Sequence, residues 1–452
     1  MSASLQLASW TAIADKAEIR RKGRRHMMSD SDAIFAKAAR RLIPFMMALY
    51  TVSFLDRVNI GFAALTMNKD LGFTPEIYGW GAGIFFFGYF LFEVPSNVIM
   101  TRVGARRWIA RIMATWAIIS AGTAFVQSPM SFYGLRFLLG LAEAGFAPGM
   151  IYYLSLWFPS RIWASYASIY LLAIPLTSVV GAPISGLILG ADGFLGFHGW
   201  QWLFFVEALP AFLLGIAVYF YLPDGPADAW FLSGREREMI ASELAAEPHA
   251  AERVHGVINA LCDSRVVLLC AVYFGIVVGL YGIGYWLPQI VQGMGFSNVQ
   301  VGLVVALPYA VAGVAQYVWG RHSDASGERV WHVMWAALIS GCAFALSAIL
   351  QSPPLVLLAL AIAAIGICST LAPFWAMPPL FLSGRGAAAG IAIINAVGNL
   401  GGFLGPYAVG WAKQETGDYA GGMLILAFSL AAAAMLVLAM GRFRRVAAAD
   451  LV

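Results

Sequence analysis

Apolar runs, separated by short polar loops, recur along nearly the whole sequence. A run of about 20 residues can cross about 30 Å of hydrocarbon as a helix, and a segment within lipid must satisfy its own backbone hydrogen bonds. The pattern therefore predicts twelve transmembrane helices. We place them at 42–66, 77–101, 107–126, 130–158, 162–189, 200–222, 266–291, 299–320, 332–350, 354–379, 386–412 and 421–440. The fourth and fifth are longer than the rest, so we expect them to be tilted or bent.

The polar segments divide the chain into two groups of six spans. Residues 223–265 form the one substantial hydrophilic stretch between predicted spans. We expect a basic, weakly ordered cytoplasmic tail, a first six-helix bundle, a cytoplasmic linker, a second six-helix bundle and a second cytoplasmic tail. These units occupy 1–41, 42–222, 223–265, 266–440 and 441–452.

The two groups of spans repeat one another at a fixed offset of 223 residues. Gly72-Phe73 recurs as Gly295-Phe296, and several further pairs lie at topologically equivalent places: Gly79 and Gly302, Gly104 and Gly327, Arg106 and Arg329, Trp108 and Trp331, Tyr50 and Tyr273, Gly61 and Gly284. A duplicated six-helix unit with a long linker is typical of transporters whose site lies between the halves near mid-membrane. The expected fold is therefore an all-α polytopic membrane protein of two pseudo-symmetric six-helix bundles.

Composition supports a membrane protein, since 60% of the residues are hydrophobic and only 12% are charged. A soluble chain of this length needs more polar surface. The 28 Lys and Arg residues lie in the tails, the central stretch and the loops on one side, apart from Lys69, Lys413, Arg57 and Arg136. The positive-inside rule then places both termini in the cytoplasm, and we expect a multi-pass protein of the bacterial inner membrane.

The same features exclude several classes of protein. The basic residues lie in loops rather than on one folded face, which argues against nucleic-acid binding. The four cysteines have no metal-type spacing, and we find no nucleophile–base pair. We therefore do not expect an enzyme, and we expect no cofactor. The coupling ion that we expect is a proton.

Four ionisable residues lie deep within predicted spans: Asp56 and Arg57 in the first, Arg136 and Glu143 in the fourth. A charge at the bilayer centre costs about 2.5–3.5 kcal/mol, so it persists only when paired or lining a cavity. Arg136 and Glu143 are seven residues apart and therefore share one helix face. Their counterparts in the second half are all uncharged: Gly279, Leu280, Ala359 and Gly366.

These four charges suggest an anion site coupled to a proton. A guanidinium meets a carboxylate with two parallel hydrogen bonds, which makes Arg57 and Arg136 candidates for binding a substrate anion. A buried carboxylic acid can carry a proton, which makes Asp56 and Glu143 candidates for proton coupling. Because substrate and acid compete for the same arginine, protonation of the acid frees that arginine for the substrate. The alternative is a purely structural buried salt bridge.

Neutral side chains within spans are weaker candidates for substrate contact. Asn395 and Asn399 lie four residues apart on one face of the eleventh span, where helix–helix hydrogen bonding is an equal alternative. Tyr89 and Tyr281 could line the cavity, although aromatic residues in spans usually serve packing. Two further acids complete the set: we expect Glu93 to pair with loop arginines and Glu207 to be structural.

The loops at the cytoplasmic ends of the second and eighth spans carry clustered charge. A gate between helices can form charge pairs in one state and break them in another, while simple anchoring by the positive-inside rule is an equal alternative. The candidate gate residues are Arg102, Arg106, Arg107, Arg321 and Asp324.

Several of these stretches together resemble the major facilitator superfamily over residues 40–445, and more narrowly its anion:cation symporter branch. They are Leu55-Asp56-Arg57-Val58-Asn59-Ile60, Phe92-Glu93-Val94-Pro95-Ser96-Asn97, Gly104-Ala105-Arg106-Arg107-Trp108-Ile109-Ala110-Arg111, Arg136 through Glu143, and Asn395 through Gly405. The resemblance implies proton-driven uptake of organic anions. It assigns Asp56 and Glu143 to proton coupling, Arg57 and Arg136 to the anion, and Tyr89 and the two asparagines to substrate contact.

Within that branch, residues Leu65 to Phe73 and the following spans look most like bacterial tartrate transporters. The stretch Leu171 to Pro175 carries no amide side chain where sugar-acid relatives would show one. We therefore expect a functional monomer in the lipid bilayer that imports a small hydroxy-dicarboxylate such as tartrate. The alternatives are a permease for an aromatic carboxylate of the phthalate or hydroxyphenylacetate type, favoured by the tyrosines and Phe374-Trp375, and an anion sensor on the same fold.

Overall fold

The computed structural model describes residues 3–246, 264–378 and 385–449, and these segments contain helices and no strand. Side chains are described from residue 31 onward, except at 160–161, 164–165, 168, 247–263, 379–389 and after 440. Much of the predicted linker, with Cys262 and Arg253, lies outside the described residues. The all-α fold expected from the hydrophobic pattern is confirmed.

The first half of the chain, which we call the N half, comprises α1 to α8. Their bounds are α1 (Ala3–Leu71), α2 (Pro75–Val103), α3 (Ala105–Gly122), α4 (Pro129–Glu143), α5 (Phe146–Ser155), α6 (Ser160–Leu171), α7 (Ala173–Ile188) and α8 (Gly199–Tyr221). A short helix, α9 (Gly234–Ala245), follows in the linker.

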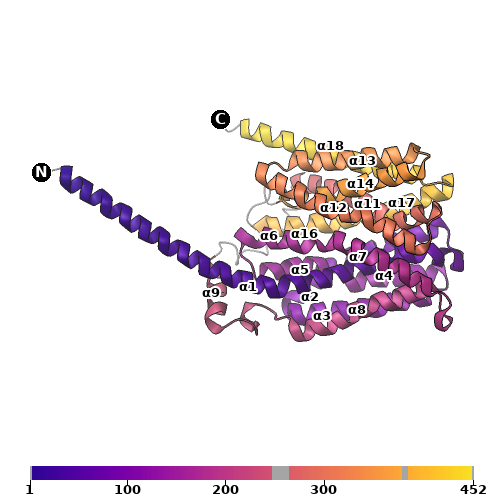
Figure 1. Cartoon of the computed structure of the whole chain (residues 1–452), viewed down its shortest axis with the longest axis horizontal. Coiled ribbons are helices and arrows are strands. Elements are labelled where there is room, and N and C mark those ends of the chain that lie inside the picture. The colour runs from indigo at the N-terminus through magenta and orange to yellow at the C-terminus, as the bar shows by residue number, and fades with distance from the viewer. Residues whose placement is uncertain (1–2, 247–263, 379–384, 450–452) are drawn as a thin grey trace.

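The second half, the C half, comprises α11 to α18. Their bounds are α11 (Ser264–Gly293), α12 (Asn298–Ser326), α13 (Val330–Ile349), α14 (Pro353–Trp375), α16 (Arg385–Asn399), α17 (Gly401–Thr416) and α18 (Ala420–Ala449). The helices of the two halves run nearly parallel to one another (Figure 1).

Eleven spans among the described residues are long and apolar enough to cross a membrane. The predicted span 42–66 is not one of these eleven, because Asp56, Arg57 and Asn59 lower its mean hydropathy. It lies within α1, which also includes most of the segment that we expected to be a weakly ordered tail. Residues 3–41 contain no proline and many alanines, which favours helix, and Figure 1 shows this end of α1 projecting from the bundle.

The bends predicted for the fourth and fifth spans are present, and the eleventh span is also broken. The fourth is divided into α4 and α5 at Gly145, whose φ of 87° is left-handed. The fifth is divided into α6 and α7 at Leu172, and the eleventh into α16 and α17 at Leu400. Each break lies inside a membrane span, where an irregular backbone is tolerated only next to protein or a cavity.

The internal repeat recurs in the backbone. Gly72 and Gly295 both have positive φ, as do Gly104 and Gly327. The residue two positions after each of the first pair, Thr74 and Ser297, caps the next helix by accepting a hydrogen bond from a backbone N–H. The turns at Gly72 and Gly295 are therefore alike in both features, whereas Gly104 and Gly327 differ in ψ, at 149° and 7°.

The halves pack tightly at one end of the helices. We call the end with the Gly72 and Gly295 turns the far end, and the end with the Gly104 and Gly327 loops the basic end. At the far end α2 packs on α17, and α7 packs on α12. A Cβ on Gly79 would lie 2.7 Å from the Pro406 carbonyl oxygen, and a Cβ on Gly302 would lie 2.5 Å from that of Ala182.

Polar contacts also join the halves at the far end. The Asn68 amide donates to Gln289 over 3.3 Å, and the Tyr78 hydroxyl donates to the Tyr285 carbonyl over 3.0 Å. Towards the basic end, α16 makes only limited contact with α2. The described helices are therefore closed at the far end and looser at the basic end.

Candidate functional site

Arg57 lies where the two halves meet, and it is the centre of the candidate site. Its guanidinium Nη2 forms an ion pair with the Glu143 carboxylate of α4, and its Nη1 donates to the Tyr281 hydroxyl of α11 over 3.0 Å. The side chains of Arg57 and Glu143 are only 5% and 1% exposed. This is a fully desolvated charge pair, for which the loss of one partner leaves the other uncompensated.

Glu143 is held in place by both sequence and backbone. It is the last residue of α4, immediately before the break at Ala144 and Gly145. Its carboxylate also accepts a 2.9 Å hydrogen bond from the Ser53 hydroxyl of α1, one turn before Arg57. The structure therefore brings Arg57 and Glu143 together. This contact is needed if the Glu143 carboxylate is to compete with a substrate anion for the Arg57 guanidinium.

Aromatic rings surround the Arg57 guanidinium. Its central carbon lies 5.2 Å from the Phe85 ring centroid and 5.1 Å from that of Tyr89, both on α2. Tyr281 packs against Phe86 with centroids 4.4 Å apart. The Tyr89 hydroxyl is buried and has no hydrogen-bond partner. Tyr89 and Tyr281, both predicted contacts, thus line the wall of this site.

Asp56 points away from Arg57, toward α3. It accepts hydrogen bonds from the Trp116 indole over 2.7 Å and from the Ser120 hydroxyl over 3.0 Å. Adjacent residues on a helix point about 100° apart, so Asp56 and Arg57 face different neighbours. The sequence placed both in one charge cluster, but the structure separates Asp56 from the ion pair.

Arg136 also lies apart from that pair, although it is buried. Its guanidinium donates to the Gly81 and Ala82 carbonyls of α2 over 3.4 Å each, and Nη1 has no partner. Its central carbon lies 5.1 Å from the centroid of the Phe85 ring, which Arg57 also contacts. Phe85 therefore lies between the two arginines, and one donor group of Arg136 remains available to a ligand.

Glu93 of α2 corrects one expectation. We expected it to pair with loop arginines, but it lies inside the protein and accepts a 2.6 Å hydrogen bond from the Asn395 amide of α16. It is four residues after Tyr89 on the same helix face, and its second carboxylate oxygen has no hydrogen bond. That spacing was the available signal that Glu93 belongs with Tyr89 in the site.

The two asparagines of the eleventh span differ in position. Asn395 bridges to Glu93 across the halves, and Asn399 is buried one turn further on. Glu207 of α8, which we expected to be structural, accepts a 2.6 Å hydrogen bond from the Ser185 hydroxyl of α7.

The predicted gate residues do not come together in this conformation. Arg106 pairs with Asp224 at 3.7 Å within the N half, while Asp324 pairs with Arg329 at 2.5 Å and Arg321 contacts Tyr317 within the C half. Arg102 and Arg107 are exposed. Among the described residues, no ion pair joins this set across the halves, as expected for a loosely closed basic end.

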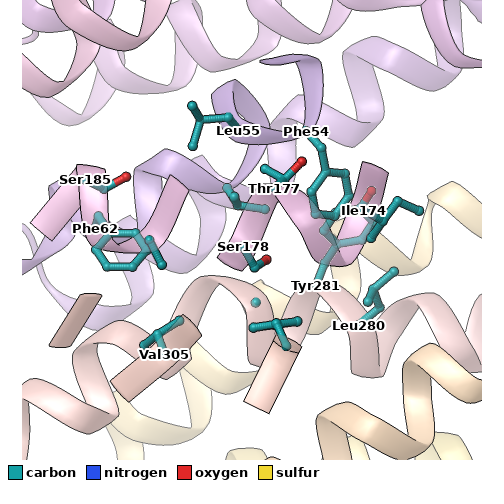
Figure 2. Close-up of a pocket in the computed structure, with 14 residues that line it drawn as sticks. Phe54, Leu55, Phe62, Ile174, Thr177, Ser178, Ser185, Leu280, Tyr281 and Val305 are labelled. Carbon is teal, nitrogen blue, oxygen red and sulfur yellow. The ribbon is translucent and has the colours of Figure 1, made fainter. Parts of the chain in front are cut away.

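A small cavity of about 20 Å³ lies between α1, α7, α11 and α12. This volume has room for about one water molecule. Figure 2 shows Tyr281 and Ser185 among its lining side chains, with Phe54, Phe62 and Ser178. The cavity is therefore lined by Tyr281, which bonds Arg57, and by Ser185, which bonds Glu207.

The arrangement lets the Glu143 carboxylate and an added anion compete for the Arg57 guanidinium. The Glu143 carboxylate pairs with the guanidinium that a substrate carboxylate would need. Proton binding to Glu143 would release that guanidinium. Within the described residues, no group of three or more His, Cys, Asp or Glu side chains could hold a metal ion.

Comparisons with known proteins show the family to which the chain belongs. The sequence model of the Major Facilitator Superfamily matches residues 46–406. The chain is 52% identical over 418 residues to a candidate tartrate transporter of Agrobacterium vitis, covering 92% of this chain and 96% of that protein. It is 41% identical over 389 residues to a quinolone resistance transporter of Acinetobacter baumannii, covering 85% and 90%.

Among solved structures, the chain resembles a bacterial homologue of the human lysosomal transporter Spinster in an inward-facing and occupied conformation. The TM-score is 0.68, with 17% sequence identity and coverage of 90% of this chain and 96% of that one. At this level of identity the likeness supports the fold alone.

Proposed function

This chain belongs to the Major Facilitator Superfamily, and we propose that it is a proton-coupled symporter that imports a small organic carboxylate by alternating access. That it is a membrane transporter and not an enzyme follows from the family. The carboxylate that we propose is a hydroxy-dicarboxylate such as tartrate, on the strength of the Agrobacterium vitis relative.

One observation carries this proposal: the only ionic partner of Arg57 among the described residues is a titratable carboxylate, Glu143. When Glu143 is ionised it neutralises Arg57, and the site has little attraction for an anion. When Glu143 is protonated, the guanidinium is free to bind a carboxylate with two hydrogen bonds. Proton and substrate therefore bind together, and loss of the proton to the cytoplasm favours release.

The packing of the halves is consistent with the release step. If the basic end faces the cytoplasm, as the charge distribution predicts, the closed far end faces the other side. The present conformation is then inward-facing, and Arg57 is paired with Glu143 in it. We propose that Arg136, Tyr89, Asn395 and Asn399 contact the bound substrate, with Glu93 added from the structure.

An aromatic carboxylate is a second candidate substrate, favoured by the rings of Phe85, Phe86 and Tyr89 next to Arg57. A thermal-shift screen of the purified protein with tartrate, glucarate, phthalate and hydroxyphenylacetate at two pH values would discriminate between the candidates. A tartrate shift that grows at acidic pH supports the first candidate. A larger shift with phthalate or hydroxyphenylacetate supports the second.

The coupling mechanism is tested by Glu143→Gln in reconstituted vesicles. Glutamine cannot gain or lose the proton, so we expect radiolabelled tartrate to exchange across the membrane without being accumulated in response to a pH gradient. Glu236→Gln, which removes a surface acid, is the matched control and should accumulate tartrate normally. If Glu143→Gln retains pH-driven accumulation, Glu143 is not the coupling acid.

A further inference from the structure

Glu207 is a buried carboxylic acid outside the Arg57 site. It lies on α8, is 1% exposed, and has one carboxylate oxygen without a hydrogen-bond partner. A buried acid with an unmade hydrogen bond is costly in lipid-embedded protein. The hydrogen-bonding groups around Glu207 therefore bear on whether its carboxyl group is protonated or ionised.

The single hydroxyl hydrogen of Ser185 lies near two oxygen atoms, and this bears on the protonation of Glu207. The Ser185 hydroxyl oxygen lies 2.6 Å from Glu207 Oε1 and 3.0 Å from the Gly181 carbonyl oxygen. A serine has one hydroxyl hydrogen, and both neighbours are acceptors when Glu207 is ionised. If the serine donates to Gly181, the 2.6 Å contact needs a hydrogen from Glu207.

Asn59 gives a second, independent indication. Its amide nitrogen donates to Asp56 over 3.4 Å, and it lies within hydrogen-bonding reach of the Glu207 carboxyl. Its own Oδ1 is a fully buried acceptor with no donor. A protonated Glu207 could supply that donor, whereas an ionised Glu207 would need a hydrogen from the same amide nitrogen that contacts Asp56.

Asp56 is surrounded differently. It receives donors from Trp116, Ser120 and Asn59, which suits the ionised form. Asp56 is also the charged group that faces Glu207, and Arg136 and Glu143 of α4 act on Asp56 from farther away. Among the described residues neither acid is in an ion pair, so simultaneous ionisation of both would leave two uncompensated charges bridged by one amide.

We propose that Asp56 and Glu207, bridged by Asn59, form a second proton-binding site in the N half, with the proton on Glu207 in this conformation. This inference rests on the proposed proton symport for its role, although not for the location of the proton. The cavity in Figure 2 is lined by Ser185, which contacts Glu207, and by Tyr281, which contacts Arg57. The second site and the first therefore border the same cavity.

Infrared spectroscopy of the purified protein locates the proton without requiring transport. At neutral pH we expect a carboxylic-acid C=O band that is lost in Glu207→Gln and kept in Glu236→Gln. Ser185→Ala keeps the acid but removes a hydrogen bond, so it should shift the band rather than abolish it. This variant keeps the test available if Glu207→Gln does not fold.

Transport assays then test the role of the site. Glutamine fixes the neutral form, so we expect Glu207→Gln to lose pH-driven tartrate accumulation severalfold and to lose tartrate counterflow by a smaller factor. A band unchanged in Glu207→Gln, or wild-type accumulation by the folded variant, overturns the proposal. If the wild-type protein shows no pH-driven uptake at all, the proposed symport fails, while the infrared result still decides whether Glu207 holds a proton.

Discussion

At the scale of single residues, function depends on how buried charges are compensated. Arg57 has an acid, a tyrosine hydroxyl and aromatic faces around it, whereas Arg136 has only backbone carbonyls and a ring. A planar guanidinium satisfies several such partners at once, while an ammonium acts as a point charge. Arginine is therefore needed at position 57 for geometry as well as for charge.

Arg57→Lys tests this requirement. We expect the variant to fold and to bind tartrate at least about tenfold more weakly, the factor that about 1.4 kcal/mol represents. Titration calorimetry of the purified protein measures the change, with Arg107→Lys at an exposed position in the first turn of α3 as the control. Tartrate binding by Arg57→Lys at wild-type affinity would contradict our assignment of the anion site.

The sequence predicted which charged residues are buried better than it predicted how they pair. A charge inside an apolar run stands out, which is why Arg57 and Glu143 could be predicted. The direction in which Asp56 points depends on the rotation of α1 against α3, and the Glu93–Asn395 contact joins residues 302 positions apart. The orientation of Asp56 and the Glu93–Asn395 contact both depend on how the helices pack, so local sequence alone could not predict them.

At the scale of elements, the breaks within spans position the acids. Glu143 ends α4, and the left-handed Gly145 starts the change of direction into α5. Glycine is required there twice over, because its φ is 87° and a Cβ would lie 2.3 Å from the Ser96 hydroxyl. The bend was predictable from the length of the apolar run, although its location was not.

Gly145→Ala should destabilise the protein by at least about 1–2 kcal/mol, the penalty of a left-handed backbone for a residue with a Cβ. We expect a lower melting temperature and weaker proton coupling, because Glu143 would shift relative to Arg57. Gly134→Ala in the same span is the control, since a Cβ at that position would have nothing within 4 Å and φ is not positive there. Equal melting temperatures for both variants would show that the bend is adaptable.

The linker helix α9 is attached to α1 by a pair outside the membrane. Lys37 bonds both carboxylate oxygens of Glu236 at 2.9 Å, and the hydrogen bond from Lys37 holds the pKa of Glu236 below its ordinary value of 4.5. A lowered pKa means that the pair stabilises docking above the ordinary pKa and is lost as the pH falls through the lower, folded value.

Hydrogen exchange of residues 234–245 should therefore be pH-dependent beyond its intrinsic rate. We expect protection of α9 to be retained at neutral pH and to fall below pH 4.5, while Glu236→Gln exchanges faster already at neutral pH. The effect should be small, since both side chains are partly exposed. Equal protection in wild type and variant at neutral pH would show that other contacts hold α9.

At the scale of the whole molecule, the two halves meet through pseudo-symmetric glycine contacts at the far end. Gly79 and Gly302 are related by the 223-residue repeat, and Gly302 contacts Pro183, the counterpart of the Pro406 that Gly79 contacts, as well as Ala182. The repeat and the fold were predictable because duplicated turns leave the same residues at a constant offset. The sequence could not predict which end is closed, because the conformations closed at the far end and at the basic end have the same sequence.

Gly302→Leu should shift the protein toward a conformation open at the far end, because the side chain would collide with the Ala182 carbonyl. Spin labels at Lys69 and Val299 report on that end, and we expect their mean distance to increase. Gly293→Leu is the control, since nothing lies within 4 Å of a Cβ there. Unchanged distances in Gly302→Leu would mean that α7 and α12 can separate without opening the halves.

The ion pair of Arg57 with Glu143 also bears on the leakage of protons through the proposed symporter in the absence of substrate. With the acid ionised, the vacant carrier has no net charge at its centre and can reorient across the low-dielectric barrier. With the acid protonated and no cargo present, the guanidinium would stand uncompensated, and such a charge is costly to bury. Protons should therefore cross only in the company of an anion, so the pair would protect the cell from futile dissipation of its proton gradient.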